Sequence, residues 1–504
     1  MPLLWLLLTL TGLPLAAQTK TPFQSAAATI TEADLIRKVG IIAADSMQGR
    51  GTPSRGLEQT AEYVAAEFRR VGLKPLGEAG SYLQRFGVSR WSIDTARSVV
   101  EVRGNGRHDI ARLGSDARFI LGKIPDQPLH GPVVLITGMD SAVVKATMDV
   151  QGKIVLLVAD FSRPVTPALN QKIVDLSEAG PKAVLVLSNR DSATFALRLA
   201  SSARPRLMRD SENGSETGAP VIELHERSVS GVLAGAGIDL VRLRQLARSE
   251  QRVIAGLQVE VRLTRQVVAR AQVPNVIGVL EGSDSLLRRE YLVYSAHIDH
   301  IGISPGQPDS INNGADDNAA AVAALLELAE AFTQPGARPK RSFLFLAPSA
   351  EGDGLLGSAH FTEHPTVPLC QVVANLNMDL IGRNWRDSVI AVGMEQSDLG
   401  SVLQLVAQAH PELRMTPIAD RWPEERIFYR SDHYNFARKG VPILFFTSGT
   451  HADYPQPSDE ADRIDSEKEA RLVRLLFYLG ARVADTLPRP RWVAESYRQI
   501  VERK

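Results

Sequence analysis

The sequence of 504 residues contains a single cysteine, Cys370. One cysteine excludes an internal disulfide framework and any zinc site built from several cysteine thiolates. Charge of either sign is not in excess, because 57 Lys and Arg residues are balanced by 57 Asp and Glu residues. This balance gives no indication of nucleic acid or of an anionic membrane as a partner. Evidence for a function therefore lies in local groups of side chains.

An apolar run without charge stands at the start of the chain, from residue 3 to residue 17. It is short for a membrane span, and Ala16 and Ala17 provide small residues near a cleavage site. The run predicts a signal peptide over residues 1–17. An N-terminal anchor is the alternative, since the usual Lys or Arg before the run is missing. We expect an exported protein, periplasmic or extracellular, without a membrane span in the mature chain.

The length of the chain predicts two or three domains. Residues 31–68 carry two helical patterns on either side of a polar loop, residues 45–51, which we interpret as a connector. From residue 116 to residue 262, short apolar runs bounded by turn residues predict a β-rich module. Later apolar runs alternate with helical patterns, which predicts an α/β domain with helices on both faces of its sheet. A Pro-rich break precedes a predicted helical tail, residues 488–504.

The stretch from residue 291 to residue 318 contains the strongest local signal. An apolar run predicts a buried strand that ends at His297, and the following turn-rich loop closes on Asp317 before an alanine-rich helical pattern. Imidazole and carboxylate suit a divalent ion such as zinc. Asp299 is placed to accept the free ring N–H of His297. A packed histidine and an aspartate that caps the helix remain the alternative.

Further acidic side chains follow three other predicted strands. Glu351 follows one strand, Asp379 follows the next, and Asp453 and Asp459 follow a third. Ligand sites in α/β sheets lie beyond the carboxyl ends of the strands. We therefore expect these carboxylates to gather near His297.

Four motifs stand in a characteristic order: GADDN, AEGDGLLGS, NMDLIGR and SDHYNFARKGVPILFF. Together they resemble peptidase family M28, which comprises zinc exopeptidases, aminopeptidases among them, with a two-metal site. The resemblance implies a discontinuous peptidase domain, residues 27–115 and 265–487, folded as a three-layer α/β/α sandwich around a mixed sheet. Residues 116–262 resemble a protease-associated (PA) domain, whose implied role is that of a lid or a docking surface.

The resemblance also assigns roles to individual residues. His297, Asp317 and Asp379 match metal ligands, and Asp317 matches the carboxylate that bridges two metals. Glu351 matches the general base, which takes a proton from the activated water and passes it to the leaving amine. Asp299 matches the carboxylate that orients His297. Three ligands and a water are sufficient for a catalytic zinc.

Two positions depart from the family pattern. Gly352 stands where the family has a second glutamate, and Pro455 stands where it has a histidine. Neither residue has a side-chain donor, so we expect one zinc ion, with the second site lost. A second site rebuilt through Asp353 or His451 is the alternative. Other histidines are expected on the surface or in loops: His300, His360 and His364.

Three functions are compatible with these patterns. The first is an exported metallopeptidase that hydrolyses N-terminal residues from peptides. The second is a catalytically impaired or inactive relative that acts as a binding or scaffold protein, as Gly352 and Pro455 suggest. The third is another amidohydrolase, such as a carboxypeptidase, in which Arg383 or Arg430 binds a substrate carboxylate; we expect both arginines to be structural or surface residues instead.

Overall fold

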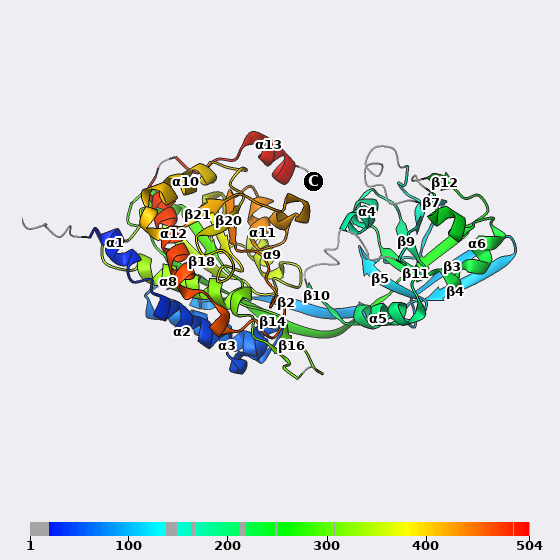
Figure 1. The fold of residues 1–504 in the computed structure, drawn as a ribbon, viewed down its shortest axis with the longest axis horizontal. Coiled ribbons are helices and arrows are strands. Elements are labelled where there is room, and N and C mark those ends of the chain that lie inside the picture. Colours follow the sequence, from blue (N-terminus) through cyan, green and yellow to red (C-terminus); the bar gives the residue numbers. More distant parts are fainter. Residues whose placement is uncertain are drawn as a thin grey trace, which may run out of the picture. The chain divides into compact units, whose positions relative to one another are not determined.

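The computed structural model describes residues 20–137, 149–162, 167–210, 218–246, 250–306, 308–486 and 488–502. The predicted signal peptide lies outside the described residues. The chain divides into two compact units, shown in Figure 1. Unit 1 comprises the residues up to Arg85 and those from Val273 on, and unit 2 comprises residues 86–272. Within the described ranges, no helix is both long and apolar enough to cross a membrane.

Unit 1 is built on a mixed sheet with the strand order β14-β18-β15-β19-β22-β20-β21. The four central strands are parallel to one another: β18 (Ser342–Ala347), β15 (Tyr291–Ser295), β19 (Val372–Met378) and β22 (Ile443–Thr447). Nearly all of their residues are buried, as expected for a sheet covered on both faces. The outer strands include antiparallel pairings and are β14 (Arg265–Leu280), β20 (Ser388–Val392) and β21 (Thr416–Ile418).

Side chains of β15 alternate between the two faces of the sheet. Tyr294 packs with Phe332 and Phe343 and donates a hydrogen bond to a carbonyl of α12 (Ser466–Asp485). Val293 belongs instead to the apolar cluster that contains Phe361 and Phe436. Helices α2 (Glu32–Ile42), α8 (Ala320–Phe332) and α12 pack together, and so do α9 (Leu356–Glu363) and α11 (His433–Ala437). The predicted three-layer α/β/α sandwich with a mixed sheet is confirmed.

Unit 2 contains a six-stranded and a four-stranded sheet around its own apolar core. Its first residue is Phe86, whereas the sequence patterns placed the start of the inserted module at residue 116. The reason is long-range pairing: β3 (Val99–Gly104) pairs with β13 (Gln258–Arg262), so residues near 100 join the core of unit 2. The resemblance of this unit to a PA domain stays a prediction. The predicted tail forms the short helix α13 (Ala494–Tyr497) and a following turn, Arg498–Glu502.

Candidate metal centre

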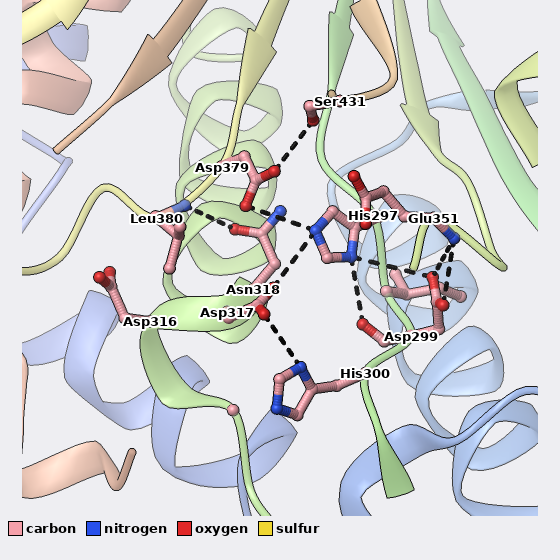
Figure 2. Close-up of polar contacts among 12 residues, drawn as sticks. His297, Asp299, His300, Asp316, Asp317, Asn318, Glu351, Asp379, Leu380 and Ser431 are labelled. Carbon is pink, nitrogen blue, oxygen red and sulfur yellow. Dashed lines mark hydrogen bonds and ion pairs between the residues drawn. The ribbon is translucent and has the colours of Figure 1, made fainter. Parts of the chain in front are cut away.

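The carboxyl edge of the central sheet carries the predicted site. His297 follows β15, Glu351 follows β18 and Asp379 follows β19, so parallel neighbours deliver all three to the same edge. Asp317 comes from the turn Ala315–Ala319 that leads into α8. Figure 2 shows these side chains converging around the His297 ring.

Three side chains form a compact group of donors. Nε2 of His297 lies 3.5 Å from Oδ1 of Asp317 and 3.4 Å from Oδ1 of Asp379. Two ligands at 2.0–2.2 Å from a tetrahedral zinc ion are about 3.3–3.6 Å apart, so the spacing fits one ion. Nε2 of His297 and Oδ1 of Asp379 are buried and make no hydrogen bond. In the described part of the chain, these residues are the one group of three with metal-ligand spacing.

A chain of hydrogen bonds holds Asp379 in place. Its Oδ2 accepts a hydrogen bond from Ser431 at 2.9 Å, and Ser431 accepts one from Asn377 at 3.0 Å. Asn377 in turn accepts from Ser295 at 2.6 Å, and Ser295 accepts from Asn375 at 2.9 Å. All these polar side chains are buried. Oδ1 is thereby left as the free oxygen of Asp379, directed at His297.

Asp299 lies next to His297 but makes a different contact from the one predicted. Nδ1 of His297 is 3.1 Å from the backbone oxygen of Asp299, whereas the Asp299 carboxylate is 3.8 Å away. That carboxylate accepts the backbone N–H of Glu351 at 3.1 and 3.2 Å (Figure 2). The backbone carbonyl of Asp299 therefore orients the His297 ring, and its carboxylate positions the backbone of Glu351. The sequence spacing alone does not reveal which oxygen of Asp299, backbone or side chain, faces the ring.

Arg50 is a component of the site that the sequence patterns did not indicate. Its guanidinium is 1% exposed and donates hydrogen bonds of 2.6–2.9 Å to four backbone carbonyls, those of Ile42, Ile298, Asn313 and Gly314. Burial lowers the pKa of Arg50 to about 10, against the attraction of Asp317 and other carboxylates. The loop interpreted as a connector therefore contributes a buried arginine that clamps the segments next to His297 and Asp317, the predicted ligands.

Asp459 provides a second support. Its carboxylate accepts the backbone N–H groups of Asp316 and Asp317 at 3.0–3.2 Å, which fixes the turn that presents Asp317. Asp453 instead pairs with Arg383 at 2.8 Å. Arg383 is therefore engaged in a structural ion pair, as expected.

The other histidines differ in burial and in their contacts. His300 lies in a loop, which is one of the two predicted locations, but its side chain is only 2% exposed, and its Nδ1 lies 3.2 Å from Oδ2 of Asp317 (Figure 2). His451 pairs with Asp316 at 3.2 Å and not with Asp317. His364 is exposed and His360 is partly exposed, as predicted.

The charges of the site influence one another strongly. Burial by itself raises the pKa of Asp317, but the neighbouring His300, His297 and Arg50 hold this pKa at about 2. Burial raises the pKa of Glu351 well above its usual range. Burial also lowers the pKa of His297, yet the surrounding carboxylates outweigh this effect and raise it well above the usual range. Buried carboxylates around one histidine, with pKa values shifted by burial and by one another, are typical of a site that favours a bound cation.

A mixed α/β sandwich that gathers one histidine, two aspartates and a glutamate at the edge of its sheet has the fold and the set of side chains expected of a zinc peptidase. Residues 275–480 match the model of peptidase family M28. This part of the chain is therefore a domain of that family, and the predicted resemblance is confirmed.

Similar proteins agree with this assignment. Aminopeptidase YwaD of Bacillus subtilis (strain 168) is 25% identical over 242 residues, which cover 47% of this chain and 42% of that protein. A protein of Pyrenophora teres f. teres named "Probable zinc metalloprotease" is 28% identical over 119 residues, 24% of this chain and 25% of that protein. The chain thus spans less than half the length of these curated relatives. A solved aminopeptidase from Aneurinibacillus sp. strain AM-1 has the same fold, with a TM-score of 0.52 and 15% identity over 92% of this chain and 96% of that one.

Proposed function

We propose that the protein is an M28 metallopeptidase that hydrolyses N-terminal residues from peptides and uses one zinc ion held by His297, Asp317 and Asp379. The observation that carries the proposal is the spacing of the three side chains, together with the lack of hydrogen-bond partners at the buried Nε2 of His297 and Oδ1 of Asp379. The names of the similar proteins support zinc and aminopeptidase activity. The apolar run at residues 1–17 supports action outside the cytoplasm.

In this function, zinc supplies a Lewis acid and lowers the pKa of a water molecule. Glu351 holds the proton of the attacking water and delivers it to the nitrogen of the departing amine. Burial raises the pKa of Glu351 well above its usual range, which makes its carboxylate a stronger base than an exposed one. Asp299 fixes the backbone of Glu351 and keeps the base beside the His297 ring.

The two departures from the family pattern support a single ion. A glycine at position 352 and a proline at position 455 leave no donor where the family has ligands for its second metal. Neither proposed substitute supports a rebuilt site: His451 is paired with Asp316, and Asp353 is absent from the group of donors at metal-ligand spacing. Loss of one electrostatic stabiliser commonly costs about 10²–10³ in rate, so we expect a slow enzyme.

The decisive experiment combines metal content with activity. Protein purified without chelator and loaded with zinc is assayed for zinc per chain and for hydrolysis of amino-acid arylamides. We expect one zinc per chain, slow hydrolysis, and a loss of about 10²–10⁴-fold in kcat for Glu351→Gln with its zinc retained. His364→Ala, an exposed histidine variant, serves as the control and keeps full activity. Zinc without any Glu351-dependent hydrolysis of peptides or arylamides would favour the binding protein instead.

A further inference from the structure

His300 makes a contact with Asp317 that the family resemblance does not account for. A bridging carboxylate needs both oxygens, one for each metal ion. Here Oδ1 of Asp317 faces His297, and Oδ2 faces Nδ1 of His300 at 3.2 Å. The second oxygen is therefore occupied by an imidazole of the protein itself.

The position of the His300 ring is fixed by the backbone around it. The backbone N–H of His300 donates to the carbonyl oxygen of Arg50 at 3.2 Å. A Cβ atom on Gly314 would lie 2.6 Å from Cδ2 of the ring, so the ring is packed directly against this glycine. Gly314 has a φ of +57°, a conformation that favours glycine. The backbone around His300 therefore holds its side chain in the site.

The rest of the second-metal side agrees with this arrangement. Gly352 and Pro455 offer no ligand there, and the turn that carries Asp317 is held by Asp459 and Arg50. Nε2 of His300 is buried and has no hydrogen-bond partner among the described residues. The polar role of the ring is therefore confined to Nδ1 and its contact with Asp317.

We infer that His300 takes the place of a second metal ion against Asp317 and fixes this carboxylate as a one-sided ligand for a single zinc. His300 is a positioning residue: it acts through Asp317 and touches neither the metal nor the substrate. Hydrogen bonds of this kind, from a second residue to a ligating carboxylate, typically contribute 10–100-fold to metal affinity. The inference rests on the proposed zinc site and adds a reason why the site holds one ion.

Variants at position 300 separate the hydrogen bond from simple packing. His300→Ala removes the donor. His300→Asn places an amide nitrogen close to the position of Nδ1 and keeps the donor, while it gives up only an Nε2 that has no partner. His300→Gln fills similar space but carries its amide nitrogen one bond farther out, near Nε2. His364→Ala is the matched control at an exposed histidine.

The measurements are zinc per chain, the zinc dissociation constant by competition with a chromophoric chelator, and the visible spectrum of the cobalt-loaded protein. We expect one zinc for the wild type, a dissociation constant 10–100-fold higher for His300→Ala and His300→Gln, and a value within about threefold of wild type for His300→Asn. The cobalt spectrum should change in the first two variants and be retained in His300→Asn. Circular dichroism of the metal-free proteins verifies that each variant is folded. If His300→Ala does not fold, the zinc dissociation constants of His300→Gln and His300→Asn are compared and test the inference.

Three results would overturn the inference. Unchanged zinc affinity in His300→Ala and His300→Gln would show that the contact does not support the ligand. Equal losses of zinc affinity in His300→Asn and His300→Gln would show that the packing of the side chain matters and that its hydrogen-bond donor does not. Two zinc ions in the wild type would show that a metal displaces the ring. A wild type that binds no zinc would instead refute the proposed function and the inference with it.

Discussion

Arg50→Lys is expected to weaken both the fold of unit 1 and the metal centre. The guanidinium reaches four carbonyls from three nitrogens in a rigid plane, at 2.6–2.9 Å. A lysine ammonium offers three donors around one point and cannot span the same acceptors. We expect at least two carbonyls to lose their partner. Each buried, unsatisfied carbonyl costs about 1–3 kcal/mol, so the substitution should lower the free energy of unfolding by about 2–6 kcal/mol.

Urea unfolding of the metal-free protein, followed by circular dichroism, measures this loss, and chelator competition measures zinc affinity. Arg70→Lys is the control, because Arg70 is half exposed and pairs with Glu67 and Glu330 at the surface; its replacement should cost less than about 1 kcal/mol. The clamp would be refuted if Arg50→Lys were as stable as the control and bound zinc as tightly as the wild type.

Three other outcomes are expected. Ser431→Ala frees Oδ2 of Asp379 and should weaken zinc binding by about 10–100-fold in a chelator competition, with little change in substrate KM. The buried His433 ring has a pKa lowered by burial from 6.5 to about 3, so the unfolded chain binds a proton between these values that the native protein does not. Stability should therefore fall by up to about 1.4 kcal/mol per pH unit as pH drops below 6.5, and His433→Gln should reduce this slope in urea titrations. Zinc at 100 times its dissociation constant should add about 2.7 kcal/mol to the stability of the wild type, and His297→Ala should lose this gain in calorimetry.

The central part of the site was predictable because it depends on local order. His297, Glu351 and Asp379 each follow a buried apolar run, and parallel strands bring such positions to one edge. The turn before α8 likewise marked Asp317. These residues can be recognised in the sequence because each stands next to a predicted strand or helix.

The supporting residues were not predictable in the same way. Arg50 and His300 gain their roles from carbonyls and a carboxylate that lie far along the chain or across a turn, and neither belongs to a periodic pattern. The start of unit 2 was misplaced for a related reason, since β3 reveals its domain only through its pairing with β13. Neither the composition of a sequence nor the spacing of its motifs predicts long-range backbone hydrogen bonds.

The clamp of Arg50 and the support from Asp459 have a consequence for the time at which the centre forms. A growing chain emerges from its N-terminus, so Arg50 is made first, His297 follows only after all of unit 2, and Asp459 is the last of the three. The turn that presents Asp317 gains its last backbone partners only when Asp459 has been made and docked. We therefore infer that a nascent chain carries no assembled centre before Asp459 has been made and has joined the fold.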